Sequence, residues 1–291
     1  MSRGHDSLNR TEPEHELLHA VEAESNRRGE LRATGPLPVS AGPQVSSSQT
    51  ESDPTSPDSL LARCPRTYWT PDPGSMIFLS ARELTQSTEE LRSLRSRLYR
   101  LRESHPIKSL LITSALQAEG KSYIAGNLAH VLALQPGCRV LLIDADMRNP
   151  RLHSMLGASS APGLSEYLLD EVDEFGIMQK GLAENLFFVP SGRSVPGPTE
   201  LLASGRMRSL LERVEPLFDW IIVDSPAAIP VSDASLLGGN CDGVLLVVHS
   251  GLTPFDVAQK ARDRFRENQL VGVVLNAIEN GHPARSQHYG S

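Results

Sequence analysis

The sequence predicts an α/β domain whose doubly wound, mostly parallel sheet lies between two layers of helices, after a disordered N-terminal region. Three observations support this. From residue 109 onward, six apolar runs of strand length alternate with helical segments. A turn ending in Gly-Lys-Ser follows the first run directly, and acidic residues end two later runs. Continuously apolar strands are typical of parallel sheets that helices cover on both faces.

Composition excludes several classes of protein. The 291 residues carry a formal net charge of −7, which disfavours nucleic acid as a partner. The three cysteines, Cys64, Cys138 and Cys241, are scattered, so free thiols in a reducing compartment are expected. No apolar run reaches the roughly 18 residues of a membrane span, and the polar N-terminus lacks a secretory signal. We therefore expect a cytoplasmic protein that reaches the membrane only through a partner.

Residues 1–73 are rich in Ser, Pro, Glu and Gly, most clearly in AGPQVSSSQTESDPTSPDS. Such a segment buries too little apolar surface to offset its ordering entropy, so the region is predicted to be mostly disordered. A short helix is expected only near Glu14–Arg27.

Residues 74–105 change character. Leucines recur there at spacings of three and four, which predicts an amphipathic helix between about 80 and 103. These leucines are Leu91, Leu94, Leu98 and Leu101. Glu89, Arg92 and Arg95 follow another stripe of the same helix; by themselves they fit either a solvated face with helical ion pairs or an oligomerisation surface.

Residues 106–280 form the predicted α/β domain, and residues 281–291 a flexible tail. The expected strands are SLLITSA, CRVLLIDAD, LFFVPSG, DWIIVDSP, DGVLLVVHS and LVGVVLNAI, and one intervening helix runs through 127–134. In open parallel sheets, ligands bind at the carboxyl ends of the strands, so the residues at those ends are the candidate site.

The first strand runs into Ser114–Ser122, whose last three residues are Gly-Lys-Ser. Between a strand and a helix, this ending is typical of a phosphate loop, in which backbone N–H groups face the anion. Lys121 is then expected on the outer phosphates and Ser122 on Mg²⁺. The tripeptide alone also fits an ordinary turn, and Ala115 stands where the general pattern has Gly.

Acidic residues end the second and fourth strands. Asp144 and Asp146 are two residues apart and therefore point to the same side, where they can hold a metal or accept a proton. Asp224 follows the apolar run WIIV, as a Walker B aspartate does. Each has a simpler interpretation, as a solvated strand end or a helix cap. Together with the Gly-Lys-Ser turn, they predict a site for a triphosphate and its cation.

These motifs give the chain a family resemblance. From about Glu89 to Ile278 it resembles the bacterial tyrosine kinases of capsule and exopolysaccharide synthesis, P-loop NTPases related to ParA and MinD. The resemblance rests on ITSALQAEGKS, VLLIDADMRNPRLH, GLSEYLL, VPSGRSVPGPTELLAS, FDWIIVDSPAAIPVSDA and GVVLNAI, in that order. It implies an ATP-dependent, autophosphorylating protein-tyrosine kinase that regulates polysaccharide synthesis and export.

The resemblance also implies roles for individual residues. ATP and Mg²⁺ are the implied cofactors. The nucleotide-binding residues are Ala118, Glu119, Gly120, Lys121, Ser122, Tyr123 and Asn276, the last near the adenine. Catalytic roles fall to Lys121, Asp144, Asp146 and Asp224, with Asp144 as the base, and metal roles to Ser122 and the same three aspartates. Glu89, Arg92 and Arg95 match the motif through which such kinases assemble into rings.

The chain departs from the family pattern in the loop, in the tail and at Ala227, where a second Pro is common, and Tyr123 follows Ser122 where the family has Thr. Gln117 and Ala118 replace the usual Pro-Gly of the loop, and a positive backbone angle at Ala118 would carry strain. The family's tail is a tyrosine cluster, whereas here it holds only Tyr289. A tail of about ten extended residues reaches roughly 35 Å, so Tyr289 is the candidate phosphoacceptor for a neighbouring subunit.

The resemblance implies a homo-oligomer and a separate transmembrane polysaccharide co-polymerase, or adaptor, that activates the kinase. Two alternatives remain open at this stage. One is a ParA- or MinD-like ATPase switch, although Leu116 stands where such proteins carry a lysine that reaches across a dimer. The other is an ATP-binding scaffold of the same polysaccharide system that has lost catalysis.

Overall fold

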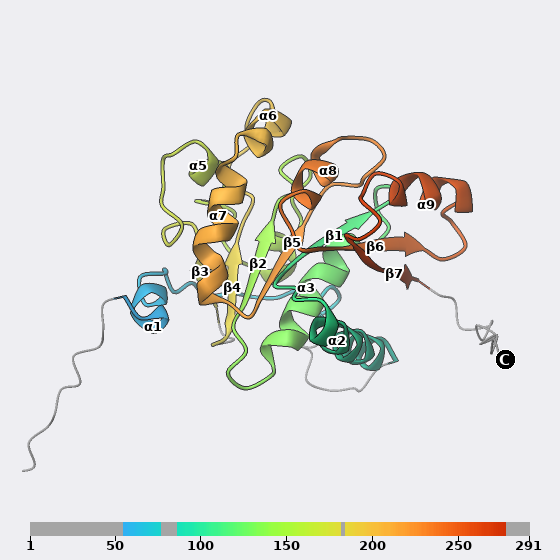
Figure 1. Ribbon diagram of the computed structural model, residues 1–291. Coiled ribbons are helices and arrows are strands. Elements are labelled where there is room, and N and C mark those ends of the chain that lie inside the picture. The colour runs from blue at the N-terminus through green and yellow to red at the C-terminus, as the bar shows by residue number, and fades with distance from the viewer. Residues whose placement is uncertain (1–54, 77–85, 182–183, 278–291) are drawn as a thin grey trace, which may run out of the picture. The chain divides into compact units, whose positions relative to one another are not determined.

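The computed structural model describes residues 55–76, 86–181 and 184–277. Within them lies a sheet with the strand order β3-β4-β2-β5-β1-β6-β7 (Figure 1). All neighbouring strands are parallel except β3 and β4. The strands are β1 Ser109–Ser114, β2 Val140–Asp144, β3 Gln179–Lys180, β4 Leu186–Val189, β5 Trp220–Asp224, β6 Gly243–His249 and β7 Leu270–Asn276. The predicted doubly wound, mostly parallel sheet is confirmed.

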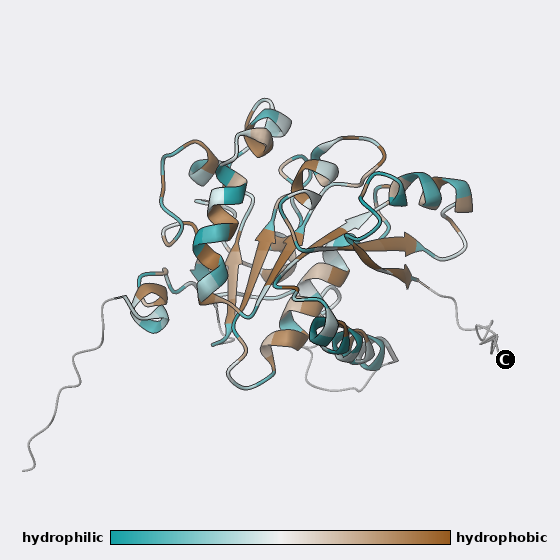
Figure 2. Cartoon of the chain, in the orientation of Figure 1, coloured by the Kyte–Doolittle hydropathy of each residue, from teal (hydrophilic) through white to brown (hydrophobic). Residues whose placement is uncertain are grey.

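The six predicted strands are all present, and Figure 2 shows their continuous apolar character. Side chains of β1, β2, β4 and β5 are buried along the whole of each strand, as a sheet covered on both faces requires. The sequence did not reveal β3, because a two-residue antiparallel edge strand has no periodicity of its own.

Helices cover both faces of the sheet. One apolar layer packs under α2, α3 and α4, and the other under α5 to α9. The helices are α1 Pro57–Leu61, α2 Gln86–Ser104, α3 Lys121–Ala133, α4 Leu152–Leu156, α5 Leu164–Leu168, α6 Pro198–Ala203, α7 Arg206–Val214, the 3₁₀ turn η1 Glu215–Leu217, α8 Asp233–Gly238 and α9 Phe255–Arg262. The described elements therefore form the three-layer arrangement that the alternation of strands and helices predicts.

Helix α2 confirms the predicted amphipathic helix. Leu91 and Leu98 are buried, and the other two leucines of the stripe are half-buried against the same apolar layer. Arg95 Nη1 donates a hydrogen bond of 2.9 Å to the carbonyl oxygen of Val131 in α3. This contact fixes α2 on the domain and occupies one of the three residues assigned to oligomerisation.

The prediction of disorder is wrong for residues 55–73. This stretch, which we call the strap, contains α1, and Thr70 N donates a hydrogen bond to Gly157 O. Trp69 is 3% exposed, and its ring meets that of Phe188 edge-on at 6.1 Å between centroids. Composition predicted disorder because the strap is locally polar, whereas its few apolar anchors pack on a surface made by distant strands. Residues 1–54, including the helix expected near Glu14–Arg27, lie outside the described residues.

Two smaller expectations concern the thiols and the membrane. All three cysteines are free, as predicted from their scattered positions, and all three are buried. Within the described ranges, no helix combines the length and the apolar character that a bilayer span needs.

Candidate active site

The predicted phosphate loop lies between β1 and α3. Gly120 precedes the helix with a φ of 92°, in the left-handed region that glycine tolerates. Ala118 also lies in that region, with a φ of 63°. Its Cβ crowds the backbone there, so the strain that the sequence predicted for a positive angle is present.

Glu119 and Asn276 hold this loop in place. Glu119 Oε2 accepts a hydrogen bond of 2.7 Å from the N–H of Leu116, and Oε1 accepts one from the Thr253 hydroxyl. Asn276 Nδ2, at the end of β7, donates to the Glu119 carbonyl oxygen at 2.9 Å. A Cβ on Gly120 would lie 2.0 Å from that Nδ2. Asn276 thus contacts the loop directly, and its place near the adenine stays a prediction.

Lys121 is the cation at the centre of the site. Its Nζ lies 2.7 Å from Asp146 Oδ2 and 3.3 Å from Ser122 Oγ, and its side chain is almost completely buried. Burial lowers the pKa of Lys121, but the charges of Asp224 and Asp146 outweigh it, so the pKa is raised. The Lys121 side chain therefore stays protonated and positively charged beside these carboxylates.

Asp144, the last residue of β2, is completely buried. Its Oδ1 accepts a hydrogen bond of 3.2 Å from Asp146 N, and its Oδ2 accepts one of 3.1 Å from Leu152 N. Burial and the nearby Asp224 raise the pKa of Asp144 well above its usual range. Because both oxygens already bind backbone N–H groups, Asp144 fixes the turn that carries Asp146.

Asp224 lies opposite Asp144 in the register between β5 and β2. It is fully buried, and neither of its oxygens has a hydrogen-bond partner in the described residues. Burial raises the pKa of Asp224 to about 6, against the opposing effect of Lys121. A buried carboxylate without a hydrogen-bond partner is costly, so this group is suited to receive a cation.

These donors fit Mg²⁺ as part of a larger coordination shell. A carboxylate with free oxygens and the Ser122 hydroxyl are hard oxygen ligands of the kind Mg²⁺ prefers. No three His, Cys, Asp or Glu side chains in the described part of the chain converge on one metal position. Mg²⁺ commonly uses one or two carboxylates together with phosphate oxygens and water, so a complete cage of protein ligands is not required.

A small pocket of about 60 Å³ opens beside the loop. Lys121 and Asp146 line it together with Arg148, whereas Asp144 is not among its lining residues. The other lining residues are Gln117, Ala118, Asn149, Pro226, Ala227, Pro230 and Val231. The pocket therefore combines charged side chains with an apolar wall, which suits a reacting group that has an apolar body and a polar tip.

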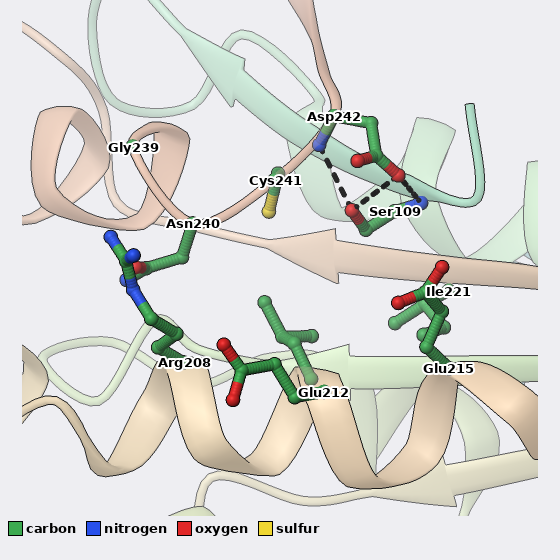
Figure 3. A pocket seen from close by; sticks show the side chains of 10 residues that line it. Ser109, Arg208, Glu212, Glu215, Ile221, Gly239, Asn240, Cys241 and Asp242 are labelled. Atoms are coloured by element: carbon green, nitrogen blue, oxygen red, sulfur yellow. Dashed lines mark hydrogen bonds between the residues drawn. The ribbon is translucent and has the colours of Figure 1, made fainter. Parts of the chain in front are cut away.

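A larger cavity of about 250 Å³ lies at the other end of the sheet (Figure 3). It opens where β1 and β6 begin, beside Ser109 and Asp242. The Asp242 carboxylate is already used there, since Oδ2 accepts hydrogen bonds from Ser109 N and Oγ at 2.8 and 2.9 Å. In open parallel sheets the carboxyl ends of the strands bind ligands, so this cavity is not the candidate site.

The remaining predicted residues lie elsewhere. The Tyr123 side chain, on α3, is half-buried against the apolar layer under that helix, and burial raises its pKa. Glu89 and Arg92 form an ion pair of 2.6 Å on the exposed side of α2. Tyr289 lies outside the described residues. Conversely, the sequence did not point to Thr253, which holds Glu119, because 134 residues separate the two.

Comparison with known proteins finds related kinases, although no protein-family model matches the chain. The chain is 34% identical over 207 residues to the tyrosine-protein kinase YwqD of Bacillus subtilis (strain 168), covering 70% of this chain and 87% of that protein. It is 35% identical over 174 residues to the tyrosine-protein kinase CpsD of Streptococcus agalactiae serotype III (strain NEM316), with coverages of 59% and 75%. Among solved structures, the kinase domain of Escherichia coli tyrosine kinase ETK aligns with a TM-score of 0.63 at 31% identity, covering 69% of this chain and 80% of that one.

Proposed function

The chain belongs to the bacterial tyrosine-protein kinases, and from that membership we propose that it transfers the γ-phosphoryl group of ATP to tyrosine at the pocket beside Lys121. The observation that carries this proposal is the meeting of three strand ends. β1 leads into the loop with Lys121, β2 leads to Asp146, and β5 ends in Asp224. A cation and two carboxylates beside a phosphate loop are the parts that phosphoryl transfer needs.

ATP binds with its phosphates over the loop, where backbone N–H groups and the start of α3 face the anion. Lys121 then exchanges Asp146 for the outer phosphates. Ser122 and Asp224 would hold Mg²⁺, which neutralises phosphate charge when bound. Direct metal roles for Asp144 and Asp146 stay predictions, and Asp144 also has both oxygens engaged by the backbone.

The acceptor tyrosine enters the pocket with its ring against the apolar wall and its hydroxyl toward Asp146. The phenolic oxygen bonds to the γ-phosphorus while the bond from that phosphorus to the oxygen of ADP breaks, and the phenolic proton passes to Asp146. Sequence alone favoured Asp144 as the base. We assign the base to Asp146 because a base must reach the proton, and Asp146 lines the pocket whereas Asp144 does not.

The wider setting follows the family resemblance. The substrate of autophosphorylation is Tyr289 of a neighbouring copy, in a homo-oligomer that assembles through Glu89, Arg92 and Arg95. The activating partner is the cytoplasmic tail of a transmembrane polysaccharide co-polymerase, which brings the kinase to the membrane. The process regulated is the synthesis and export of a capsular or extracellular polysaccharide.

The test is phosphotyrosine formation by the purified chain with ATP and Mg²⁺, with and without the partner's cytoplasmic tail. We expect phosphotyrosine at Tyr289 in mass-spectrometric mapping and its loss in Lys121→Met. The buried Tyr167 is an internal control that should stay unmodified. Phosphate at Tyr289 that persists in Lys121→Met would refute autophosphorylation, and ATP binding without transfer even with the partner would favour the scaffold.

The ParA- or MinD-like switch has less support. Leu116 occupies the position of the lysine that reaches across the dimer in those proteins, and the Glu119 carboxylate binds its backbone N–H. ATP-dependent dimerisation without any tyrosine phosphorylation would favour the switch over the kinase.

A further inference from the structure

Arg148 is held rigidly at the edge of the pocket. It follows β2, two residues after Asp146. Its Nε donates a hydrogen bond of 2.8 Å to Asp233 Oδ2, and its Nη2 donates one of 2.7 Å to Thr199 Oγ1. The Thr199 hydroxyl in turn donates to Asp233 Oδ1 at 2.5 Å. The guanidinium plane is therefore fixed by α6 and α8, two elements distant in sequence from β2.

The burial of this cluster is uneven. The Asp233 side chain is 0% exposed, whereas that of Arg148 is 41% exposed. Burying a carboxylate is expensive unless a cation and hydrogen bonds compensate it, so Asp233 and Arg148 depend on each other. The pairing leaves one edge of the guanidinium group open, because no acceptor in the described residues bonds to Nη1.

Arg148 also lines the reaction pocket. Among the residues that line this pocket, Lys121 and Arg148 are the two cations. Lys121 comes from the phosphate loop and Arg148 from the turn after Asp146, so the cations reach the pocket from different elements. Each also has a carboxylate partner, Asp146 for Lys121 and Asp233 for Arg148.

We propose that Arg148 is a catalytic residue whose free Nη1 edge binds the phosphoryl group during transfer, and that Asp233 and Thr199 are positioning residues for it. The proposal deepens the kinase function given above and rests on it. As the phosphorus leaves the ADP oxygen and bonds to the phenolic oxygen, negative charge spreads over its other oxygens. A cation that folding has already placed in position stabilises this charge best, because it does not have to rearrange during the transfer.

The experiment compares a ground-state ligand with a mimic of the group in transfer. Binding of Mg·ADP, with and without aluminium fluoride, is measured calorimetrically for the unaltered chain and for Arg148→Ala, Arg148→Lys and Thr199→Val. In Arg148→Ala we expect Mg·ADP affinity to stay within about twofold, while the aluminium fluoride complex and kcat for tyrosine weaken about a hundredfold. Added guanidinium ion should restore part of the kcat of Arg148→Ala.

The positioning residues should give a graded result. Thr199→Val leaves Arg148 in place but removes one of the hydrogen bonds that orient it. We therefore expect kcat to fall about tenfold, with the KM for the acceptor unchanged. Thr199→Ser retains the hydroxyl and should recover the loss. This recovery separates positioning from a general effect on folding.

A matched control lies elsewhere in the chain. Arg213 in α7 pairs at 2.8 Å with Glu174, which is also a nearly buried carboxylate joined to an exposed arginine. Arg213→Ala should change neither the aluminium fluoride complex nor kcat.

Two outcomes would overturn the catalytic role of Arg148. One is an equal weakening of Mg·ADP binding with and without aluminium fluoride in Arg148→Ala, which would mean that Arg148 has only a structural role. The other is a kcat for Arg148→Ala within about threefold of that of the unaltered chain. If the unaltered chain phosphorylates no tyrosine at all, the proposed kinase function fails separately. The comparison of the two nucleotide complexes still decides whether Arg148 contacts the phosphoryl position.

Discussion

The Lys121 ammonium and the Asp146 carboxylate lie 2.7 Å apart although 25 residues separate them in the chain. Both side chains are nearly buried, at 10% and 5% exposure. In the proposed reaction an ATP phosphate takes the place of Asp146 on Lys121, and that exchange frees the carboxylate for the acceptor. Nucleotide binding and activation of the proposed base are thereby coupled through one ion pair.

Lys121→Met should destabilise the protein as well as abolish transfer. It leaves Asp146 and Asp224 buried without their cation, and breaking a buried pair costs about 3 kcal/mol. Protonation of Asp224 relieves part of this penalty, so the loss should be smaller at pH 5 than at pH 8. Urea unfolding at the two pH values measures it. Lys260→Met, at an exposed ion pair, is the control and should cost under about 0.5 kcal/mol.

Mg·ADP affinity should fall as the pH drops below about 6. The pKa of Asp224 in the folded chain, about 6, lies above the roughly 3.9 of an unfolded aspartate. The protonated Asp224 side chain therefore stabilises the folded protein fully below the pKa of an unfolded aspartate, and this stabilisation is lost as the pH rises through about 6. Above that pH the side chain is a carboxylate that can bind a cation.

Proton competition with the cation limits the fall to about tenfold per pH unit. Calorimetric titrations between pH 5 and 8 give the profile. Asp224→Asn should bind weakly with a flat profile, whereas the exposed Asp256→Asn should follow the unaltered chain. A steep profile that survives in Asp224→Asn would assign the titration to another group.

Ala118→Gly should stabilise the protein by about 1 kcal/mol. The φ of 63° at Ala118 is strained for any residue with a Cβ, and glycine removes the strain at the cost of some entropy of the unfolded chain. Thermal unfolding should show a Tm higher by a few degrees. The opposite change is expected for Ala258→Gly inside α9, where glycine costs about 1 kcal/mol. An equal loss at both positions would mean that the loop is not strained.

Trp69→Ala should cost about 3 kcal/mol or more in the free energy of unfolding. The ring is buried against Phe188, and Nε1 donates a hydrogen bond of 2.8 Å to Thr67 Oγ1. Its neighbour Tyr68 is 79% exposed, so Tyr68→Ala should change the stability by less than about 0.5 kcal/mol. Similar small effects for both variants would mean that the strap does not belong to the stable domain.

Much of the fold could be predicted from local patterns. Apolar runs marked the strands from β1 to β7 apart from β3, and the leucine spacing marked α2. Both kinds of pattern can be read from residues that are close together in the sequence. The order of the strap could not be predicted, because it depends on residues far away in the sequence. Trp69 is one aromatic residue in a polar stretch, and the surface that buries it is made by strands more than a hundred residues away.

The candidate site divides in the same way. Gly-Lys-Ser, Asp144, Asp146 and Asp224 stand at strand ends that the sequence reveals, and parallel strands bring such ends to one edge of a sheet. Which carboxylate does what was not accessible from sequence. Asp144 and Asp146 look equivalent there, but the turn after β2 directs both oxygens of Asp144 to backbone N–H groups. Asp146 instead has one oxygen on the N–H of Asn149 and the other on Lys121, and it lines the pocket.

The sequence by itself therefore determined the sheet, the phosphate loop and the set of charged residues at its edge, since periodicity and spacing are local properties of the chain. Only the tertiary structure decided that the Asp224 carboxylate lacks a hydrogen-bond partner, that Lys121 pairs with Asp146 and that Asp233 orients Arg148. Those relationships depend on burial and on contacts between distant segments, and both arise only when the layers pack together.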